Sequence, residues 1–123
     1  MKNKEMGLPF GKMTKIKIAF DVDGTLRSNK TETSQGPNQR IVELFTILAS
    51  FKNTDLYVWS GGGAQYALRF AQLYKLPVKD SHCISKLGAP QMDIAIDDIQ
   101  DTAIGTINLI VNEKPVGDKS EDE

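Results

Sequence analysis

Polar side chains that could carry chemistry follow four apolar segments of this sequence, at the point where each segment ends. They are Asp21 with Asp23, Ser60, Lys86, and Asp97 with Asp98. Carboxylates that lie close together repel one another and cannot all ionise without a cation. Ligands that are all oxygen favour a hard ion such as Mg²⁺, which binds one or two carboxylates together with water and phosphate oxygens. The acids therefore predict a magnesium site, if the fold brings them together.

The remaining two side chains suit the binding of an anion. Ser60 precedes Gly61, Gly62 and Gly63, where a helix is expected to begin, and the backbone N–H groups at a helix start favour negative charge. Lys86 would add a positive charge for the same anion. A metal, an anion cradle and a carboxylate left over as a nucleophile together describe phosphoryl transfer.

Apolar segments of two alternating kinds must position these side chains. Short β-branched runs predict strands, and apolar residues at helical spacing predict helices. The expected strands are 15–20, 55–59, 81–85, 92–96 and 107–111, and the expected helices are 37–51 and 64–73. This order predicts an α/β, Rossmann-like three-layer sandwich with a mostly parallel five-stranded sheet. The carboxyl ends of parallel strands share one edge, where ligands bind, so the polar residues should converge there.

Length and composition predict a single domain. The chain has 123 residues, of which 40% are hydrophobic and 25% are charged, the balance of an ordinary globular core. The expected parts are a loose N-terminal arm (1–14), a core (15–112) and an acidic flexible tail (113–123). A net charge of −1 gives no field that would favour nucleic acid or a membrane surface. The lone Cys83 excludes an internal disulfide, and the lack of a long apolar run or a signal-like start predicts a cytoplasmic protein with no membrane partner.

One segment carries a resemblance to a known family. Phe20-Asp21-Val22-Asp23-Gly24-Thr25-Leu26 resembles the first motif of the haloacid dehalogenase (HAD) superfamily, Asp-x-Asp-Gly-Thr. Ser60 is similar to the serine or threonine of the second motif, Lys86 to the lysine of the third, and Asp97–Asp98 to the acidic pair of the fourth. The resemblance spans the region 15–112 and implies a Mg²⁺-dependent phosphatase of the small capless type.

The resemblance also implies a role for each motif residue. Asp21 would attack phosphorus to form an aspartyl-phosphate, which water then hydrolyses. Asp23 would protonate the leaving oxygen and later activate that water. Ser60, Gly61 and Lys86 would hold the transferred phosphoryl group. Charge neutralisation by the metal and by Lys86 would let an anionic nucleophile approach an anionic phosphate.

The same resemblance implies the metal ligands. Mg²⁺ would be bound by Asp21, by the backbone carbonyl of Asp23, and by Asp97 and Asp98, with the acid of the last pair that binds directly left open. Thr25, the last residue of the first motif, and Arg27, just beyond it, are candidate substrate contacts because of their position.

Three further alternatives stay open. Segments 26–36 and 74–85 are too short for a cap domain, so the site should be open to a small phosphorylated metabolite or to the phosphorylated end of a macromolecule, and a homo-oligomer could cover it. Lys86 is expected to be the phosphate-binding lysine because its rivals, Lys75 and Lys79, precede the third strand. The alternative function is that of a non-catalytic HAD-fold protein that binds a phosphate or a protein partner.

Overall fold

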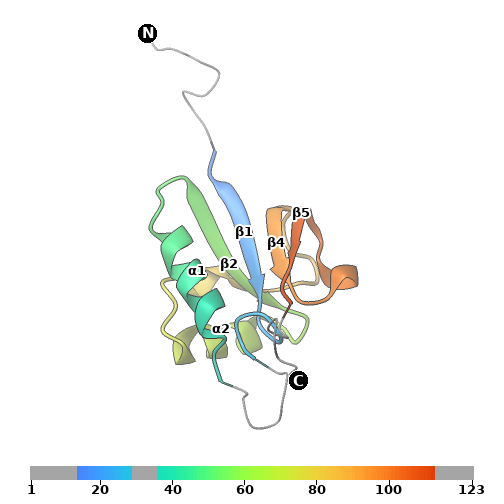
Figure 1. The fold of residues 1–123 in the computed structure, drawn as a ribbon. Helices are drawn as coiled ribbons and strands as arrows, with labels where there is room; N and C mark the ends of the chain where they lie inside the picture. The colour runs from blue at the N-terminus through green and yellow to red at the C-terminus, as the bar shows by residue number, and fades with distance from the viewer. Residues whose placement is uncertain (1–13, 29–35, 113–123) are drawn as a thin grey trace, which may run out of the picture.

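A five-stranded sheet forms the centre of the computed structural model, which describes residues 14–28 and 36–112. In chain order the strands are β1 (Ile16–Asp21), β2 (Thr54–Ser60), β3 (Cys83–Ser85), β4 (Met92–Asp97) and β5 (Gly105–Ile110). All neighbouring strands are parallel, and their order across the sheet is β3-β2-β1-β4-β5 (Figure 1). The strand β1 therefore lies in the middle, between β2 and β4.

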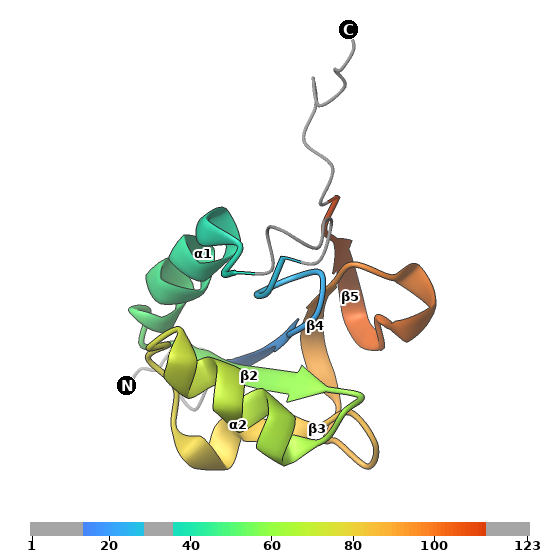
Figure 2. The ribbon, with the colours of Figure 1, turned by 90° about the horizontal axis from the view of Figure 1, so that it is seen from below.

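Two helices pack on one face of this sheet. Helix α1 (Gln39–Ala49) connects β1 to β2, and helix α2 (Ala64–Leu73) connects β2 to β3. Phe45 of α1 and Phe70 of α2 join Phe20 and Val58 of the strands in one buried cluster. Two successive right-handed crossovers in the same direction place both helices on the same face. Both lie away from β5, as the second view shows (Figure 2).

The opposite face packs around Trp59, which is 1% exposed. Ala19, Met92 and Ala95 complete this smaller cluster, and Ala89 packs on it from the loop that connects β3 to β4. A 3-10 turn, η2 (Gln100–Thr102), makes the connection from β4 to β5. In the described residues this face thus carries loop and 3-10 structure where the first face carries helices.

The predicted α/β, Rossmann-like fold class is confirmed, and the sheet is parallel throughout. Both helices and all five strands occur close to their predicted places. The strand β3 is shorter than 81–85 because residues Asp80–His82 form a 3-10 turn, η1, and β5 begins at Gly105, before the predicted 107. Within the described residues no cap domain interrupts the core.

Some predictions fall on other parts of the chain. Residues 1–13 of the predicted arm, 29–35 of the segment after β1, and the tail 113–123 lie outside the described residues. Of the helices that the structure describes, none has the length and apolar character needed to cross a membrane.

Candidate active site

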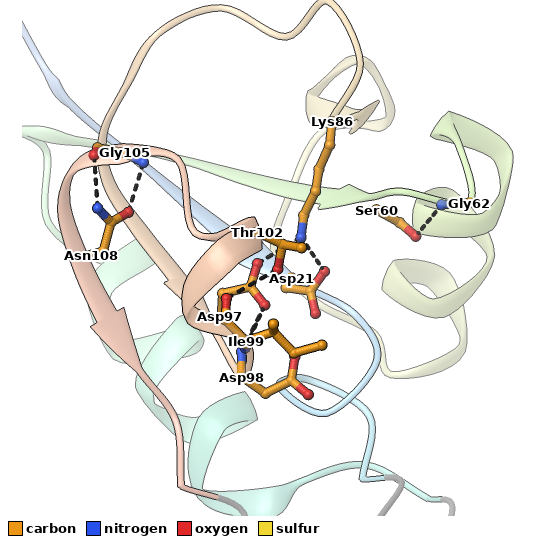
Figure 3. Close-up of polar contacts among 10 residues, drawn as sticks. All are labelled: Asp21, Ser60, Gly62, Lys86, Asp97, Asp98, Ile99, Thr102, Gly105 and Asn108. Atoms are coloured by element: carbon orange, nitrogen blue, oxygen red, sulfur yellow. Dashed lines mark hydrogen bonds and ion pairs between the residues drawn. The ribbon is translucent and has the colours of Figure 1, made fainter.

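Acids from β1 and β4 come together because these strands are neighbours. Asp21 ends β1, Asp97 ends β4, and the register pairs the residues immediately before them, Phe20 and Ile96. Asp98 follows directly. One carboxylate oxygen from each of the three acids lies within 4.8 Å of the others. These three residues, shown in Figure 3, form the acid cluster.

The turn after β1 leaves room for the third acid. Gly24 has a φ of 81°, in the left-handed region that favours glycine. A Cβ at this position would collide with the carboxyl group of Asp98. The N–H of Arg27 donates to the carbonyl of Val22 at 2.8 Å and helps to close the turn. Both the backbone conformation and the space for Asp98 therefore require glycine at position 24.

Lys86 forms a charged pair with Asp97 inside the cluster. Its Nζ donates to Oδ2 of Asp97 at 2.6 Å and lies 3.0 Å from Oδ1 of Asp21. Burial would raise the pKa of Asp97, but hydrogen bonds from Lys86 and from the N–H of Ile99 outweigh it and hold this pKa below its usual value. Burial would lower the pKa of Lys86, but the bonds to the two acids raise it instead. Both groups therefore stay ionised.

In Asp21 and Asp98, hydrogen bonds and nearby positive charge do not outweigh the effect of burial on the pKa. Burial and the charge of Asp97 raise the pKa of Asp21 to about 7, against the opposing effect of Lys86. Burial and the hydrogen bond with Asp97 also raise the pKa of Asp98. Three carboxyl groups lie together and one ammonium, that of Lys86, pairs with two of them, so full ionisation leaves two negative charges uncompensated. A cation would balance them, and a donor set made only of carboxylate oxygens fits Mg²⁺.

The segment that follows β2 is open and lies at the same edge of the sheet. The Oγ of Ser60 accepts a hydrogen bond from the N–H of Gly62 at 2.9 Å. Gly61 is exposed, and no heavy atom lies within 4 Å of the place its Cβ would take. Helix α2 begins at Ala64 without a side-chain cap. Because the N-cap residue, Gly63, offers no side-chain acceptor, the first backbone N–H groups of this helix suit an anion.

Asp23 bonds to a different set of partners. Its Oδ1 accepts hydrogen bonds from the hydroxyl of Tyr66 at 2.7 Å and from Nη1 of Arg27 at 3.1 Å. Its side chain is 45% exposed and does not belong to the acid cluster. The carboxyl group of Asp23 thus lies beside the cluster, and Arg27 is held against it rather than extended into solvent.

The contact of Tyr66 with Asp23 is one that the sequence analysis does not predict. Its signal is the spacing of Tyr66, Phe70 and Tyr74, which recur every four residues on α2. Their ring centroids lie 4.9 and 5.7 Å apart in succession. The same spacing is typical of the packed face of a helix, so the sequence alone cannot separate the two roles. Burial and the bond to Asp23 raise the pKa of the Tyr66 hydroxyl, which keeps it a donor.

The remaining sequence candidates lie around or away from the cluster. Thr25 is fully buried in the turn after β1, and its Oγ1 has no hydrogen-bond partner. Lys79 precedes β3 and lines a separate cavity of about 140 Å³ with Asp55 and His82. Lys75 follows α2, at the far end of that helix from Ser60. Lys86 is therefore the one of the three candidate lysines that contacts the acids.

Compared with known proteins, the chain matches no family model, no curated protein and no solved structure.

Proposed function

We propose that this chain is a Mg²⁺-dependent phosphohydrolase of the HAD type that works through an aspartyl-phosphate on Asp21. One observation carries the proposal. Three acids from two neighbouring strand ends each place a carboxylate oxygen within 4.8 Å of the others, and Lys86 pairs with two of them, Asp21 and Asp97. Such a cluster is costly to build for stability alone, because the uncompensated charges repel one another. The motif resemblance around Asp21 supplies the reaction type.

The metal would be held by Asp21, Asp97 and Asp98, with the backbone carbonyl of Asp23 as the further ligand that the resemblance implies. When bound, Mg²⁺ supplies positive charge that neutralises the acids and the phosphoryl oxygens. The Oδ1 of Asp97 accepts hydrogen bonds from the N–H groups of Asp98 and Ile99, at 2.7 and 3.2 Å. These bonds fix its carboxylate in place before any ligand arrives.

The proposed reaction has two displacements. A carboxylate oxygen of Asp21 forms a bond to phosphorus while the ester P–O bond breaks, and the leaving oxygen takes a proton from Asp23. Water then attacks the same phosphorus and gives a proton to Asp23. The bond between phosphorus and Asp21 breaks, so that inorganic phosphate leaves and both acids return to their starting states.

The phosphoryl group would be held by Lys86, Ser60 and the backbone at Gly61. Lys86 lies 3.0 Å from Asp21, so its charge acts where negative charge develops in the transition state. Tyr66 and Arg27 are positioning residues in this scheme, because they orient the Asp23 carboxyl group. The absence of a cap from the described residues leaves the mouth of the site open to substrates of either size class.

The test is hydrolysis of a panel of phosphate monoesters with Mg²⁺ and with a chelator, measured as released inorganic phosphate. Asp21→Asn keeps the size of the side chain but removes the anionic nucleophile. We expect turnover to fall by at least ~10³-fold, or about 4 kcal/mol of barrier. Wild-type enzyme quenched in acid should carry phosphate on Asp21, detectable by mass spectrometry. The matched control is Asp80→Asn, an exposed acid before β3, which should keep full activity.

Near wild-type hydrolysis by folded Asp21→Asn protein would reject the proposal. The alternative, a non-catalytic HAD-fold protein that binds phosphate, is favoured by one observation. The Oδ1 of Asp23 already accepts two hydrogen bonds, from Tyr66 and Arg27, so this oxygen is engaged by the protein itself rather than by a leaving group. Calorimetric binding of phosphate without turnover of any ester would support this alternative.

A further inference from the structure

A cavity of about 670 Å³ lies between the two helices. Its apolar wall includes Val42 of α1 together with Phe70, Leu73 and Tyr74 of α2. Pockets for small molecules span roughly 300–1,000 Å³, so this cavity is large enough to hold part of a substrate. None of the three clustered acids lines it.

The polar side chains around this cavity are mainly cationic. Arg27, Arg69 and Lys75 line it, and no acidic residue does so in the described part of the chain. The guanidinium carbons of Arg27 and Arg69 lie 5.3 and 5.4 Å from the ring centroid of Phe70. Arginine that is held over an aromatic ring still presents its N–H groups at the edge, where they can bind the oxygens of an anion.

Arg27 and the aromatic row of α2 connect the cavity to the candidate active site. Arg27 lines the cavity and also bonds to Asp23, at 3.1 Å. Tyr66 bonds to the same carboxyl group, and the rings of Phe70 and Tyr74 continue the row into the cavity wall. A ligand with one group at the acids could therefore extend along this row.

Lys75 occupies a position where glycine would be more stable. Its φ is 57°, in the left-handed region, directly after α2 ends. The N–H of Lys75 bonds to the carbonyl of Gln72 and that of Leu76 to the carbonyl of Ala71, at 3.1 and 2.9 Å. These bonds form the C-terminal closing motif that favours glycine at this position. A lysine here costs backbone strain and places an ammonium group at the cavity.

On the basis of the proposed phosphohydrolase function, we propose that this cavity binds a second anionic group of the substrate. The substrate is then a phosphate monoester whose leaving group carries a further phosphate. A nucleoside bisphosphate and the phosphorylated end of a nucleic-acid strand share this chemistry. The cations at the cavity would bind the second phosphate, and the rings of Phe70 and Tyr74 would pack on the organic body between the two.

The experiment compares adenosine 3′,5′-bisphosphate with adenosine 5′-monophosphate. Binding is measured by calorimetry on the Asp21→Asn protein, which removes turnover, and KM is measured on the wild type. We expect the bisphosphate to bind about tenfold more tightly, with the advantage shrinking as salt rises. A short single-stranded DNA with a terminal phosphate forms the second arm. Stronger binding of the DNA would identify a nucleic-acid end, and stronger binding of the bisphosphate would identify a small substrate.

Three variants separate recognition from folding. The bisphosphate advantage is the ratio by which adenosine 3′,5′-bisphosphate binds more tightly than adenosine 5′-monophosphate. Arg69→Gln should remove most of this advantage and change the KM for 4-nitrophenyl phosphate by less than about twofold. Lys75→Gly should also reduce the advantage while raising the melting temperature, because glycine relieves the strained backbone. A purely structural role for Lys75 cannot produce that combination. The matched control, Arg40→Gln, removes an exposed arginine of α1 that pairs with Glu43 and does not line the cavity, and it should leave the advantage intact.

Each outcome decides one of the two proposals. Equal binding of both adenosine nucleotides, or an advantage that survives in Arg69→Gln and Lys75→Gly, overturns the second-anion site. Hydrolysis of no ester, together with an advantage that depends on Arg69, overturns the phosphohydrolase and leaves the anion site standing. Hydrolysis of esters without tighter binding of the bisphosphate overturns the second-anion site and leaves the phosphohydrolase standing.

Discussion

A cluster of acids and a single acid, Asp55, lie at opposite edges of the same sheet, and their partners differ. At the carboxyl edge, Asp21, Asp97 and Asp98 lie together, and Lys86 pairs with the first two. At the amino edge, Asp55 of β2 has two partners of its own. Its Oδ1 lies 3.0 Å from Nε2 of His82, and its Oδ2 accepts a hydrogen bond from the Tyr57 hydroxyl at 3.2 Å.

The two edges differ in whether protein groups alone supply the hydrogen bonds and the charge balance that the acids need. Each oxygen of Asp55 has a partner, and the rings of Tyr57 and His82 stack with centroids 4.4 Å apart. That arrangement needs nothing further and acts as a structural clasp between β2 and the start of β3. The acid cluster instead retains more negative charge than its lysine can balance. Similar residue types therefore serve stability at one edge and, in the function we propose, ligand binding at the other.

The largest effect that would sharpen this comparison comes from the two lysines. Lys86→Gln keeps a hydrogen-bond donor but removes the charge, so kcat should fall by about 10²-fold, because the positive charge that stabilises the transition state is lost. Lys79→Gln, at the Asp55 edge, should leave kcat unchanged. The measurement is steady-state hydrolysis of the best ester in the panel. A larger loss in Lys79→Gln would place the phosphate-binding lysine at the wrong edge in our scheme.

Metal binding gives the next effect. Mg²⁺ should stabilise the folded chain by about 2.7 kcal/mol at a concentration one hundred times its Kd, because it binds only the folded state. Asp97→Asn and Asp98→Asn should weaken this stabilisation, whereas Asp55→Asn should retain it. Urea unfolding with and without Mg²⁺ measures all three variants. No stabilisation of the wild type at millimolar Mg²⁺ would show that the acid cluster balances its charge in some other way.

At the amino edge we expect a smaller effect, which changes the stability of the protein and leaves its activity unchanged. Asp55→Asn replaces a charged acceptor by an amide, so it should lower the free energy of unfolding by about 1 kcal/mol through the weakened bonds to His82 and Tyr57. Hydrolysis should stay at the wild-type level. Urea unfolding and steady-state assays measure the two quantities. A large loss of activity with unchanged stability would make Asp55 a functional residue and would remove the contrast between the edges.

Much of the carboxyl edge could be predicted because parallel strands bring distant residues to one place. Asp21 and Asp97 are far apart in the chain, but each ends an apolar run, and that pattern suffices to place them together. The sequence does not encode the register in readable form. The pairing of Phe20 with Ile96 sets the two acids level, and it depends on the packing of the whole sheet.

One feature that the sequence does not predict is a side-chain contact between distant elements. The contact between Tyr66 and Asp23 joins α2 to the turn after β1, and no local spacing predicts it.

The early start of β5 has a local cause that strand propensity does not capture. The side chain of Asn108 bonds to both the N–H and the carbonyl of Gly105, at 2.7 and 3.0 Å. These bonds extend ordered structure to a residue with low strand propensity.

A last expected effect, which involves no catalysis, concerns Cys83, which begins β3 directly after the clasp. Its thiol is buried, and burial together with the charge of Asp80 raises its pKa from 9.0 to about 11. A raised pKa means that the folded state keeps its proton while the unfolded state loses it, so the thiol costs stability between pH 9 and 11 and nothing below pH 9. At pH 8 the folded protein should therefore react with a thiol reagent at least ~10-fold more slowly than the urea-unfolded chain, because neither access nor thiolate is available. Asp55→Asn, which loosens the clasp, should speed the reaction, whereas Asp98→Asn should not. Equal acceleration by both variants would mean that the two edges open together and that the clasp does not protect β3 independently.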